Sequence, residues 1–581
     1  MSLTLHGIGV SKGIAIGKVH IINHDPIDVR EYSIPKQNIT KEIARFENAI
    51  AIARQQLIHI REQVPTDTNV DIAAFLEAHL LMLDDSLLTR VPIDLIHEHQ
   101  CNAEWALKMQ CDSIIQIFEK MDDPYLSARR NDVVQVVTRI QRVLHGYTDI
   151  SFEPQEVYFA NAIVLADDLS PADTILMRHR GILAFATEYG GTVSHTAILA
   201  RSLGIPAIVG LRRARPYIKP DDTVIVDGKQ GVILVKPDKR SIRYYRMRQS
   251  EEKRYRAALI KIKSSPTITR DGIPVTLHVN IEFPEDMTAV KRVGGEGIGL
   301  YRTEFLFMNR RIPPDEEEHF EAYSHVVRAL KGGPVTIRTL DLGADKQVVD
   351  SRSHDKGLTT NPALGLRAIR LCLKELKLFK PQLRAILRAS ALGQVRLMIP
   401  MVCSFQELVQ VHKIIEELQQ ELIQKAQQFN PKMPIGAMVE VPAMAICTDL
   451  MAPYVDFLSV GTNDLIQYTL ATDRGDEAVN YLYDPLHPAV LRLIKISIDA
   501  ATKVGKPISL CGEMASDSRY VRLLLGLGLR SFSVNPEAYL EIKQVINNTY
   551  IEGLTTITNQ IIGTSSQTNI AELLEMINTQ N

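Results

Sequence analysis

The spacing of apolar residues changes along the chain and separates regions of different structure. The first twenty residues alternate polar and apolar positions between glycines, which predicts short strands. From Ile39 to Ile60 the apolar residues recur at intervals of three and four, which predicts an amphipathic helix. The stretches 71–83, 103–121 and 132–144 repeat this spacing. Three or four such helices with short connections predict a helical bundle over residues 25–145.

Residues 146–237 show a different pattern. Short β-rich runs cover residues 162–166, 182–187, 207–210, 223–227 and 231–235, and segments such as 194–203 between them suit a helix. This alternation predicts a compact α/β domain. We expect the strands of residues 1–24 to complete it, so that the helical bundle is an insertion within this domain.

A basic segment follows the α/β region. Residues 239–263 carry ten Lys or Arg against Glu251 and Glu252. One interpretation is a surface for anionic ligands, and the favoured one is a solvated helix between domains. We therefore predict a linker helix at residues 238–266.

The remainder of the chain, residues 267–581, repeats one unit. Eight β-like runs alternate with helical stretches and cover residues 277–281, 297–301, 335–340, 395–400, 435–441, 457–460, 508–510 and 531–534. This count predicts a (β/α)₈ barrel, with an open doubly wound sheet as the alternative. A barrel demands that the chemically active residues gather at the C-terminal ends of its strands.

Composition narrows the class of protein. A chain of 581 residues suggests about three to four domains and excludes a small disulfide-stapled scaffold. The net charge is −2, with 45% hydrophobic and 23% charged residues, so nothing favours nucleic acid or a membrane surface as a partner. Without a signal-like N-terminus or a membrane-length apolar run, we expect a cytoplasmic protein that does not insert into membranes. The six cysteines form no CxxC pair, which argues against a disulfide framework or a structural zinc site.

One histidine lies in a setting suited to phosphate chemistry. In GGTVSHTAILARSLGIPAIVG, residues 190–210, Gly190 and Gly191 permit close backbone approach and Ser194 can cap a helix. His195 would then lie in the first turn, beside free N–H groups. A neutral imidazole there can attack a phosphoryl group. The alternative is a histidine that only packs in the first turn.

Two arginines follow successive predicted barrel strands. Arg302 comes directly after the second strand, in EGIGLYRTEFLFM, and Arg338 lies in the third, in TIRTLDLGADK. Two guanidinium groups that converge suit a small polyanion, since each binds carboxylate or phosphate bidentately; the alternative for each is a structural ion pair. Weaker candidates nearby are Lys346, Asn361 and Arg367.

Polar groups also follow the fifth to seventh strands. Glu440 lies in the fifth strand, and Asn463, Asp464 and Arg474 follow the sixth. Carboxylates beside phosphate-binding arginines suit magnesium; the alternatives are a buried ion pair for Glu440 and a helix N-cap for Asp464. Cys511 ends the seventh strand and is a candidate acid, with a small buried hydrophobe as the alternative.

These motifs carry a resemblance. The histidine motif resembles the phosphohistidine signature of the phosphoenolpyruvate-utilising enzymes, and the motifs together, with the opening GIGVSKGIAIGKV, resemble the Enzyme I family of the sugar phosphotransferase system along essentially the entire chain. The resemblance implies a swivelling phosphohistidine domain, an inserted helical domain and a barrel that binds phosphoenolpyruvate (PEP). It further implies Mg²⁺ as cofactor, the phosphocarrier protein HPr as acceptor, and a homodimer formed through the barrel domain.

The resemblance also implies residue roles. His195 would be phosphorylated by PEP and Cys511 would protonate the enolate to give pyruvate. The PEP-binding residues would be Arg302, Arg338, Asn463, Asp464 and Arg474. Glu440 and Asp464 would ligate Mg²⁺. The inserted helices would dock HPr, and weak contact candidates there, for which a solvated helix face is the alternative, are Glu77, His79, Asp84 and Asp85.

The sequence departs from the commonest family pattern at Glu188, Ala344 and Thr360, none of which is a named catalytic group.

The favoured interpretation is an enzyme that phosphorylates itself from PEP and passes the phosphoryl group to HPr. One alternative is a regulatory scaffold that binds PEP without turnover, although binding alone would not need both His195 and Cys511. The other is a phosphotransferase that acts on a small molecule, which lacks support because the chain shows no nucleotide-binding domain.

Overall fold

The computed structural model describes residues 3–22, 29–63, 70–119, 124–146, 161–167, 169, 181–191, 196–197, 200, 204–307, 312–342, 363–474, 479–564 and 566–579. The chain divides into two compact units, Met1–Tyr255 and Arg256–Asn581. Each unit has hydrophobic cores of its own.

The N-terminal unit contains an eight-stranded sheet with the order β1-β8-β7-β3-β4-β5-β6-β2. Its strands are β1 (Leu3–His6), β2 (Ile8–Ser11), β3 (Ile14–Ile22), β4 (Ala162–Ala166), β5 (Ala184–Thr187), β6 (Ala207–Val209), β7 (Thr223–Asp227) and β8 (Val232–Val235). Strands β3 to β6 run parallel, and the other pairs are antiparallel. Successive residues of β4, such as Ile163 and Val164, point to opposite faces of the sheet and enter different apolar clusters, as expected for a strand covered on both faces. The N-terminal strands therefore share one sheet with strands that lie about 140 residues later in the chain.

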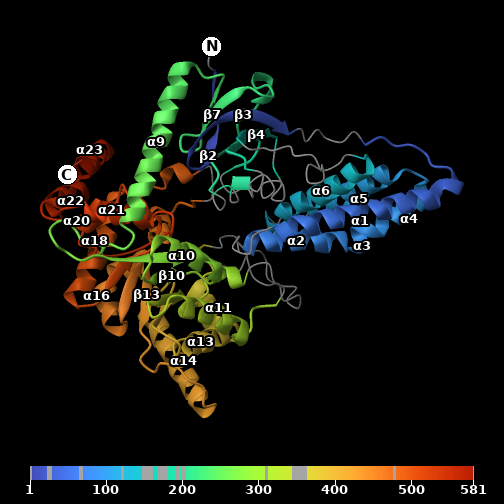
Figure 1. Ribbon diagram of the computed structural model, residues 1–581. Helices are drawn as coiled ribbons and strands as arrows, with labels where there is room; N and C mark the ends of the chain where they lie inside the picture. The colour runs from blue at the N-terminus through green and yellow to red at the C-terminus, as the bar shows by residue number, and fades with distance from the viewer. Residues whose placement is uncertain are drawn as a thin grey trace. The chain divides into compact units, whose positions relative to one another are not determined.

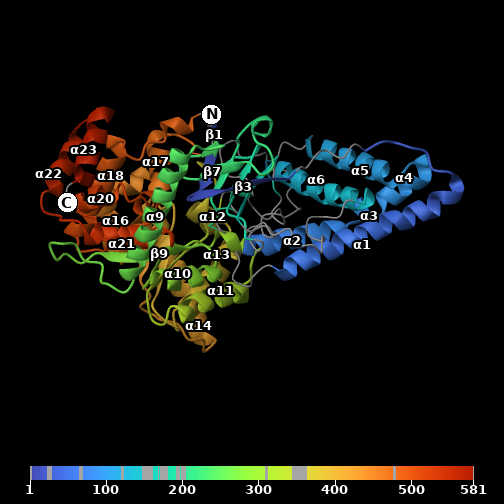
Figure 2. The ribbon, with the colours of Figure 1, turned by 45° about the horizontal axis from the view of Figure 1, so that its top comes forward.

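Helices fill the interval between β3 and β4. They are α1 (Ile39–Gln63), α2 (Val70–Leu83), α3 (Ser86–Thr89), α4 (Val91–His99), α5 (Ala103–Glu119) and α6 (Pro124–Leu144), and they pack against one another in both views (Figures 1 and 2). Fully buried residues such as Phe46, Leu107 and Ile140 form their common core. The four predicted helical stretches are present as α1, α2, α5 and α6. Two short helices, α3 and α4, add to the expected three or four, and they are too short for apolar periodicity to reveal.

The basic segment forms one helix, α9 (Lys239–Lys261), visible in green in Figure 1. Along it only Tyr245 is buried, and Arg248 contributes an ion pair of 2.8 Å from Nη1 to Asp227 Oδ2. Most of its charges face solvent, which agrees with the interpretation of a solvated helix.

The C-terminal unit is a closed barrel of eight parallel strands, which excludes the open sheet. The strands are β9 (Thr276–Ile281), β10 (Ile298–Tyr301), β11 (Val335–Arg338), β12 (Val395–Ile399), β13 (Ile435–Val439), β14 (Phe457–Val460), β15 (Ile508–Leu510) and β16 (Ser531–Val534). All eight agree with the predicted runs in place and order. Such agreement is expected because barrel strands are buried on both faces and read as short apolar runs.

Helices surround the barrel and bury their apolar faces against it. They are α10 (Met287–Val293), α11 (Glu316–Ala329), α12 (Ala368–Lys374), α13 (Leu376–Ala389), α14 (Phe405–Gln424), α15 (Pro442–Ile446), α16 (Thr448–Met451), α17 (Thr462–Leu470), α18 (Pro488–Lys503), α19 (Glu513–Ser516), α20 (Val521–Gly526), α21 (Tyr539–Asn547), α22 (Leu554–Gly563) and α23 (Gln567–Thr579). Capping boxes at Asp315 and Ser404 fix where α11 and α14 begin. None of the helices in the described ranges is long and apolar enough to cross a membrane.

Candidate active site

The candidate residues gather at the C-terminal ends of the barrel strands, where a barrel places its chemistry. Arg302 directly follows β10, and Arg338 is the last residue of β11. Glu440 and Cys511 were expected within their strands, but each lies one position beyond, after β13 and β15.

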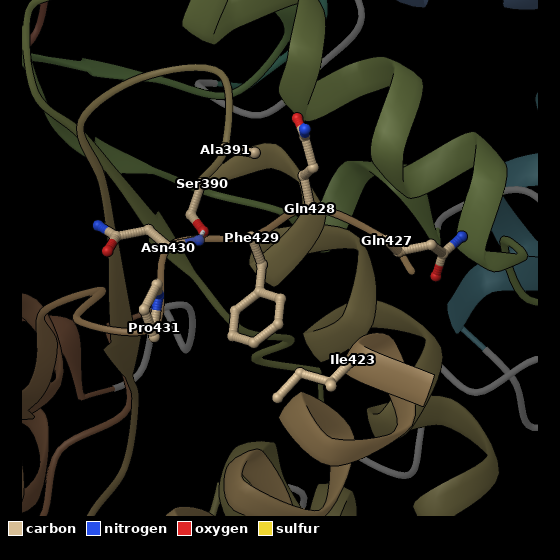
Figure 3. Close-up of a pocket in the computed structure, with 8 residues that line it drawn as sticks. All are labelled: Ser390, Ala391, Ile423, Gln427, Gln428, Phe429, Asn430 and Pro431. Carbon is tan, nitrogen blue, oxygen red and sulfur yellow. Dashed lines mark hydrogen bonds between the residues drawn. The ribbon is translucent and has the colours of Figure 1, made fainter. Parts of the chain in front are cut away.

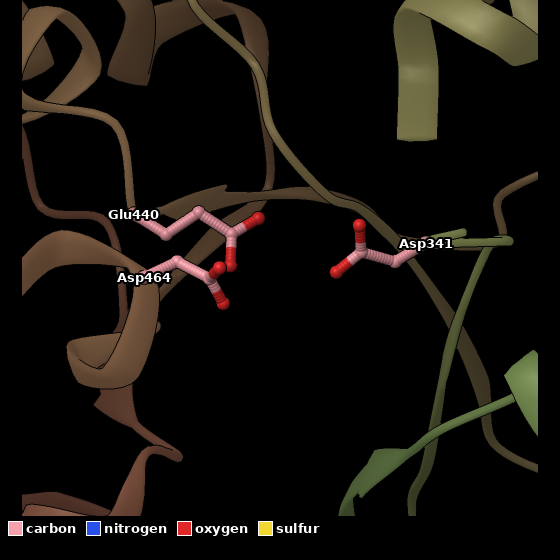
Figure 4. A group of neighbouring side chains, drawn as sticks. All are labelled: Asp341, Glu440 and Asp464. Carbon is pink, nitrogen blue, oxygen red and sulfur yellow. The ribbon is translucent and has the colours of Figure 1, made fainter. Parts of the chain in front are cut away.

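Three carboxylates meet in this mouth. Oxygen atoms of Asp341, Glu440 and Asp464 lie within 4.8 Å of one another. Figure 4 shows the three side chains facing a common space. Burial, followed by the nearby charges of Asp464 and Asp341, raises the pKa of Glu440 to about 8. A hard divalent cation suits such oxygen donors and would neutralise their mutual repulsion. The residues therefore fit a magnesium ion, and Asp341 joins the pair expected from the sequence.

Arg338 is held between two acidic side chains. Its Nη2 donates to Glu304 Oε1 at 3.0 Å, and its Nη1 lies 3.1 Å from Asp341 Oδ2. Burial opposes the charge of this guanidinium, but the two carboxylates outweigh burial and raise its pKa. Arg338 therefore forms the structural ion pairs that were the alternative to substrate binding. It also keeps the guanidinium charged and fixed at the barrel mouth.

Arg302 and Arg367 lie in the same charged environment. Arg302 Nη1 is 2.5 Å from Glu282 Oε1, so this guanidinium is paired as well. Arg367 binds Asp341 with both Nε, at 2.8 Å, and Nη2, at 3.1 Å. Its Nη1 reaches Asp464 at 3.1 Å. Arg367, a weaker candidate from the sequence, is thus placed within the carboxylate group.

The segment after β14 adds polar groups. Asn463 and Asp464 lie in the first turn of α17, whose N-cap is Gly461. The alternative role of Asp464, as the N-cap of this helix, is therefore wrong. Asn463 Oδ1 accepts the N–H of Glu513 at 2.9 Å. Arg474 Nη1 is 3.6 Å from Glu513 Oε1, and about half of the Arg474 side chain is exposed, so it lies at the rim of the site.

Cys511 lies in apolar surroundings. Its side chain belongs to a small cluster inside the barrel with Leu300, Met398, Met438 and Phe457. Burial raises the pKa of the thiol above its ordinary value. The thiol therefore stays protonated at neutral pH, as an acid requires. The same packing also agrees with the alternative role of Cys511, that of a small buried hydrophobic residue.

Other predicted residues lie elsewhere. His195, Lys346 and Asn361, with the departures Ala344 and Thr360, fall outside the described residues. Glu188 is buried and accepts the backbone N–H of Arg215 at 2.7 Å, so it fixes the loop after β6.

The four docking candidates on the helices differ in accessibility. Glu77 is exposed, and Asp84 is 3.1 Å from Arg54 Nη2 on the surface. Asp85 accepts the N–H of Leu87 and caps α3. His79 is buried and lies 4.0 Å from Asp132, so its side chain is not on the surface.

A groove at the opposite end of the barrel contains none of the candidate residues. It lies before β12 and β13 and is lined by Ser390, Ala391, Ile423, Gln427, Gln428, Phe429, Asn430 and Pro431 (Figure 3). Residues that precede barrel strands belong to the face that supports stability rather than chemistry.

Comparisons with known proteins agree with this geometry. Residues 6–129 match the N-terminal domain of PEP-utilising enzymes, 159–231 the mobile domain and 256–551 the PEP-binding domain. The chain belongs to the PEP-utilising enzyme family. A protein of Cupriavidus necator is 43% identical, covering 97% of each chain. Relatives from Listeria innocua and Bacillus subtilis are each 39% identical, covering 99% and 94% of both chains.

All three relatives carry the name phosphoenolpyruvate-protein phosphotransferase. The relatives confirm the family and the enzyme class predicted from the sequence, and the closed barrel confirms the predicted fold. Sequence reasoning missed Glu304, although it stands two positions after Arg302 in the same motif.

Proposed function

We propose that this PEP-utilising phosphotransferase transfers the phosphoryl group of PEP to its own His195, releases pyruvate, and then passes the phosphoryl group to a histidine of HPr. This would be the first step of sugar uptake by the phosphotransferase system. The observation that carries the proposal is the presence of paired arginines, three neighbouring carboxylates and the Cys511 thiol at the C-terminal ends of the barrel strands.

The barrel mouth would bind the donor. Arg302 and Arg338 would hold the carboxylate and phosphate of PEP, with Asn463 and Arg474 beside them, because guanidinium groups bind such anions bidentately. Glu440 and Asp464 would hold Mg²⁺, with Asp341 close enough to share it. When bound, the ion supplies charge neutralisation for the phosphate oxygens.

The transfer would move the phosphoryl group from the enol oxygen of PEP to the imidazole of His195. A nitrogen of the His195 imidazole forms a bond to phosphorus in line with the leaving oxygen, and the phosphorus–oxygen bond to the enolate breaks. The enolate carbon then takes the Cys511 proton, which forms the methyl group of pyruvate. The thiolate recovers a proton from solvent. Cys511 suits this role because burial keeps its thiol protonated until the enolate forms.

The proposal extends to organisation and partners. Residues 1–24 and 146–237 would form the swivel domain, 25–145 the HPr-binding domain, 238–266 the linker helix and 267–581 the PEP-binding and dimerisation domain. His195 has to serve both donor and acceptor, so the swivel domain would move as a rigid body. Among the helical candidates, exposed Glu77 and Asp84 are the better contacts for HPr. A homodimer and a cytoplasmic location complete the proposal.

Pyruvate release tests the proposal. With PEP and Mg²⁺ alone, we expect a burst of about one pyruvate per subunit, because His195 is phosphorylated once and then waits for an acceptor. Addition of HPr should convert the burst into continuous release. The variant Arg338→Met should raise the KM for PEP by at least tenfold. Continuous release without any protein acceptor would contradict the proposal and favour a small-molecule or water acceptor.

A further inference from the structure

A buried amide on the outer side of the barrel contacts both segments that carry the arginines. Gln382 lies on α13 and is fully buried. Its Oε1 accepts the backbone N–H of Leu340 at 3.0 Å. Its Nε2 donates to the hydroxyl oxygens of Thr303, at 3.0 Å, and Tyr323, at 3.1 Å.

Two of these partners belong to neighbouring strand ends. Thr303 follows Arg302 directly, and Leu340 lies between Arg338 and Asp341. Thr303 Oγ1 in turn donates to the carbonyl oxygen of Arg338 at 2.8 Å. Gln382 therefore bridges the segment after β10 and the segment after β11, alongside the direct bond from Thr303, at a place where the paired register of the two strands has ended at Tyr301 and Ile337.

Water cannot replace these bonds. Thr303 and Tyr323 are fully buried, and Leu340 is 3% exposed. Without the Gln382 amide, the N–H of Leu340 would be left unsatisfied in an apolar shell. The least costly response is a shift of the strand ends until these groups find other partners, and such a shift displaces the adjoining arginines.

The same segments also hold the counter-charges. Glu304, directly after Thr303, accepts from Arg338 Nη2 and from the N–H of Asp341, at 3.0 and 3.1 Å. A change in the separation of the two segments therefore alters the ion pair between Glu304 and Arg338 as well as the position of Arg302.

We propose that Gln382 is a positioning residue for PEP binding: its amide sets the separation of the β10 and β11 ends, so that Arg302 and Arg338 converge on one substrate. This inference rests on the proposed function of the two arginines. Gln382 lies on the outer side of the barrel, and among the described residues it reaches the site through Thr303 and Leu340, so its role is positioning rather than contact with PEP.

The test compares variants that break different bonds of the same amide. Gln382→Met keeps the length of the side chain and removes all three bonds, and we expect the KM for PEP to rise by about tenfold or more, since displacements near 1 Å cost up to about 100-fold. Tyr323→Phe removes the one bond of this amide that does not reach a strand end, together with the contact of the same hydroxyl with His319 Nδ1 at 3.0 Å, which lies on α11 and also does not reach a strand end. We expect it to leave the KM within about twofold of wild type, at a comparable loss of thermal stability.

Two further measurements keep the result interpretable. Ser497→Ala removes a fully buried hydroxyl on α18, away from the strand ends, and controls for a general loss of stability. If Gln382→Met does not fold, Thr303→Val replaces it, because valine keeps the shape and lacks the hydroxyl. Thr303→Ser, which restores the hydroxyl, should then recover PEP affinity.

The outcomes separate this inference from the proposed function. The positioning role is wrong if Gln382→Met, or Thr303→Val in its place, changes the KM for PEP no more than Tyr323→Phe does. The proposed function still stands in that case, provided that Arg338→Met raises the KM for PEP. If Arg338→Met leaves the KM unchanged, the arginine site itself is wrong. An equal KM rise in Gln382→Met, Tyr323→Phe and Ser497→Ala would show a stability effect and would also overturn the inference.

Discussion

A methyl group added at Gly512 tests how tightly the site depends on the contact between two strand ends. Gly512 lies directly after Cys511, with φ −74° and ψ 179°, a conformation that alanine adopts without strain. Its Cβ would, however, lie 1.9 Å from Thr462 Oγ1 and 2.7 Å from the backbone nitrogen of Thr462. The hydroxyl can rotate away, but the backbone cannot.

The size of the displacement follows from that backbone contact. Ordinary contacts of a Cβ begin at 3.4 Å, so the segments after β14 and β15 have to separate by about 0.7 Å. Thr462 precedes Asn463 and Asp464, and Gly512 follows Cys511, so the proposed acid moves relative to two proposed binding residues. Since a displacement of 1 Å can cost about 100-fold, we expect Gly512→Ala to lower the rate of pyruvate release by about 10- to 100-fold. The overpacking itself should cost about 1–3 kcal/mol of stability.

Single-turnover measurements with rapid quenching and saturating PEP and Mg²⁺ give this rate directly. Gly563→Ala is the matched control, because a Cβ there meets nothing within 4 Å. We expect the control to stay within about twofold of wild type, since the methyl group fits without displacement. A folded Gly512→Ala protein with the wild-type rate would refute the reasoning that the spacing of these strand ends sets the geometry of the site.

Further predictions concern single groups. Glu440→Gln should abolish most of the Mg²⁺ stimulation of PEP-dependent labelling, because an amide is a weaker ligand than a carboxylate; titration of activity with Mg²⁺ checks this, and an unchanged titration midpoint would contradict it. Cys511→Ala should lower the rate of pyruvate formation by about 100-fold or more with little change in the KM for PEP, as measured by steady-state kinetics with HPr; a rate within a few-fold of wild type would exclude the acid role. Burial alone would raise the pKa of Glu316, but hydrogen bonds from Arg384 and Arg388 outweigh burial and lower this pKa below its ordinary value of 4.5. The stabilisation by the Glu316 carboxylate is therefore fully present above pH 4.5 and is lost as the pH falls through the lowered pKa of the folded state. Glu316→Gln should thus cost about 1 kcal/mol near pH 7 and flatten the pH dependence of urea unfolding below pH 4.5; equal acid sensitivity in both proteins would count against this ion pair.

The sequence predicted those parts of the structure that depend on local pattern. The barrel strands produce apolar runs because they are buried on both faces, so their places were predictable, and with them the position of Arg302 and Arg338 at strand ends. Likewise, the long helices showed their apolar stripe. The short helix α3 was too brief to show one.

Other features depend on contacts between distant segments. Asp341 joins Glu440 and Asp464 only because closure of the barrel brings the ends of β11, β13 and β14 together. Gln382 is 79 positions from Thr303 and lies in an amphipathic helix, where one polar residue carries no signal of its own. The distance in sequence between such partners is the physical reason that pattern alone did not find them.

Transfer of radioactive phosphate from labelled PEP shows whether His195 becomes a phosphohistidine. With Mg²⁺, we predict that the wild-type protein takes up label in an acid-labile, base-stable form, that His195→Ala takes up none, and that added HPr removes the label from the protein and becomes labelled itself. Label that persists in His195→Ala would exclude His195 as the phosphorylated residue. PEP binding without any labelling of the wild type would favour a regulatory protein that binds PEP without turnover.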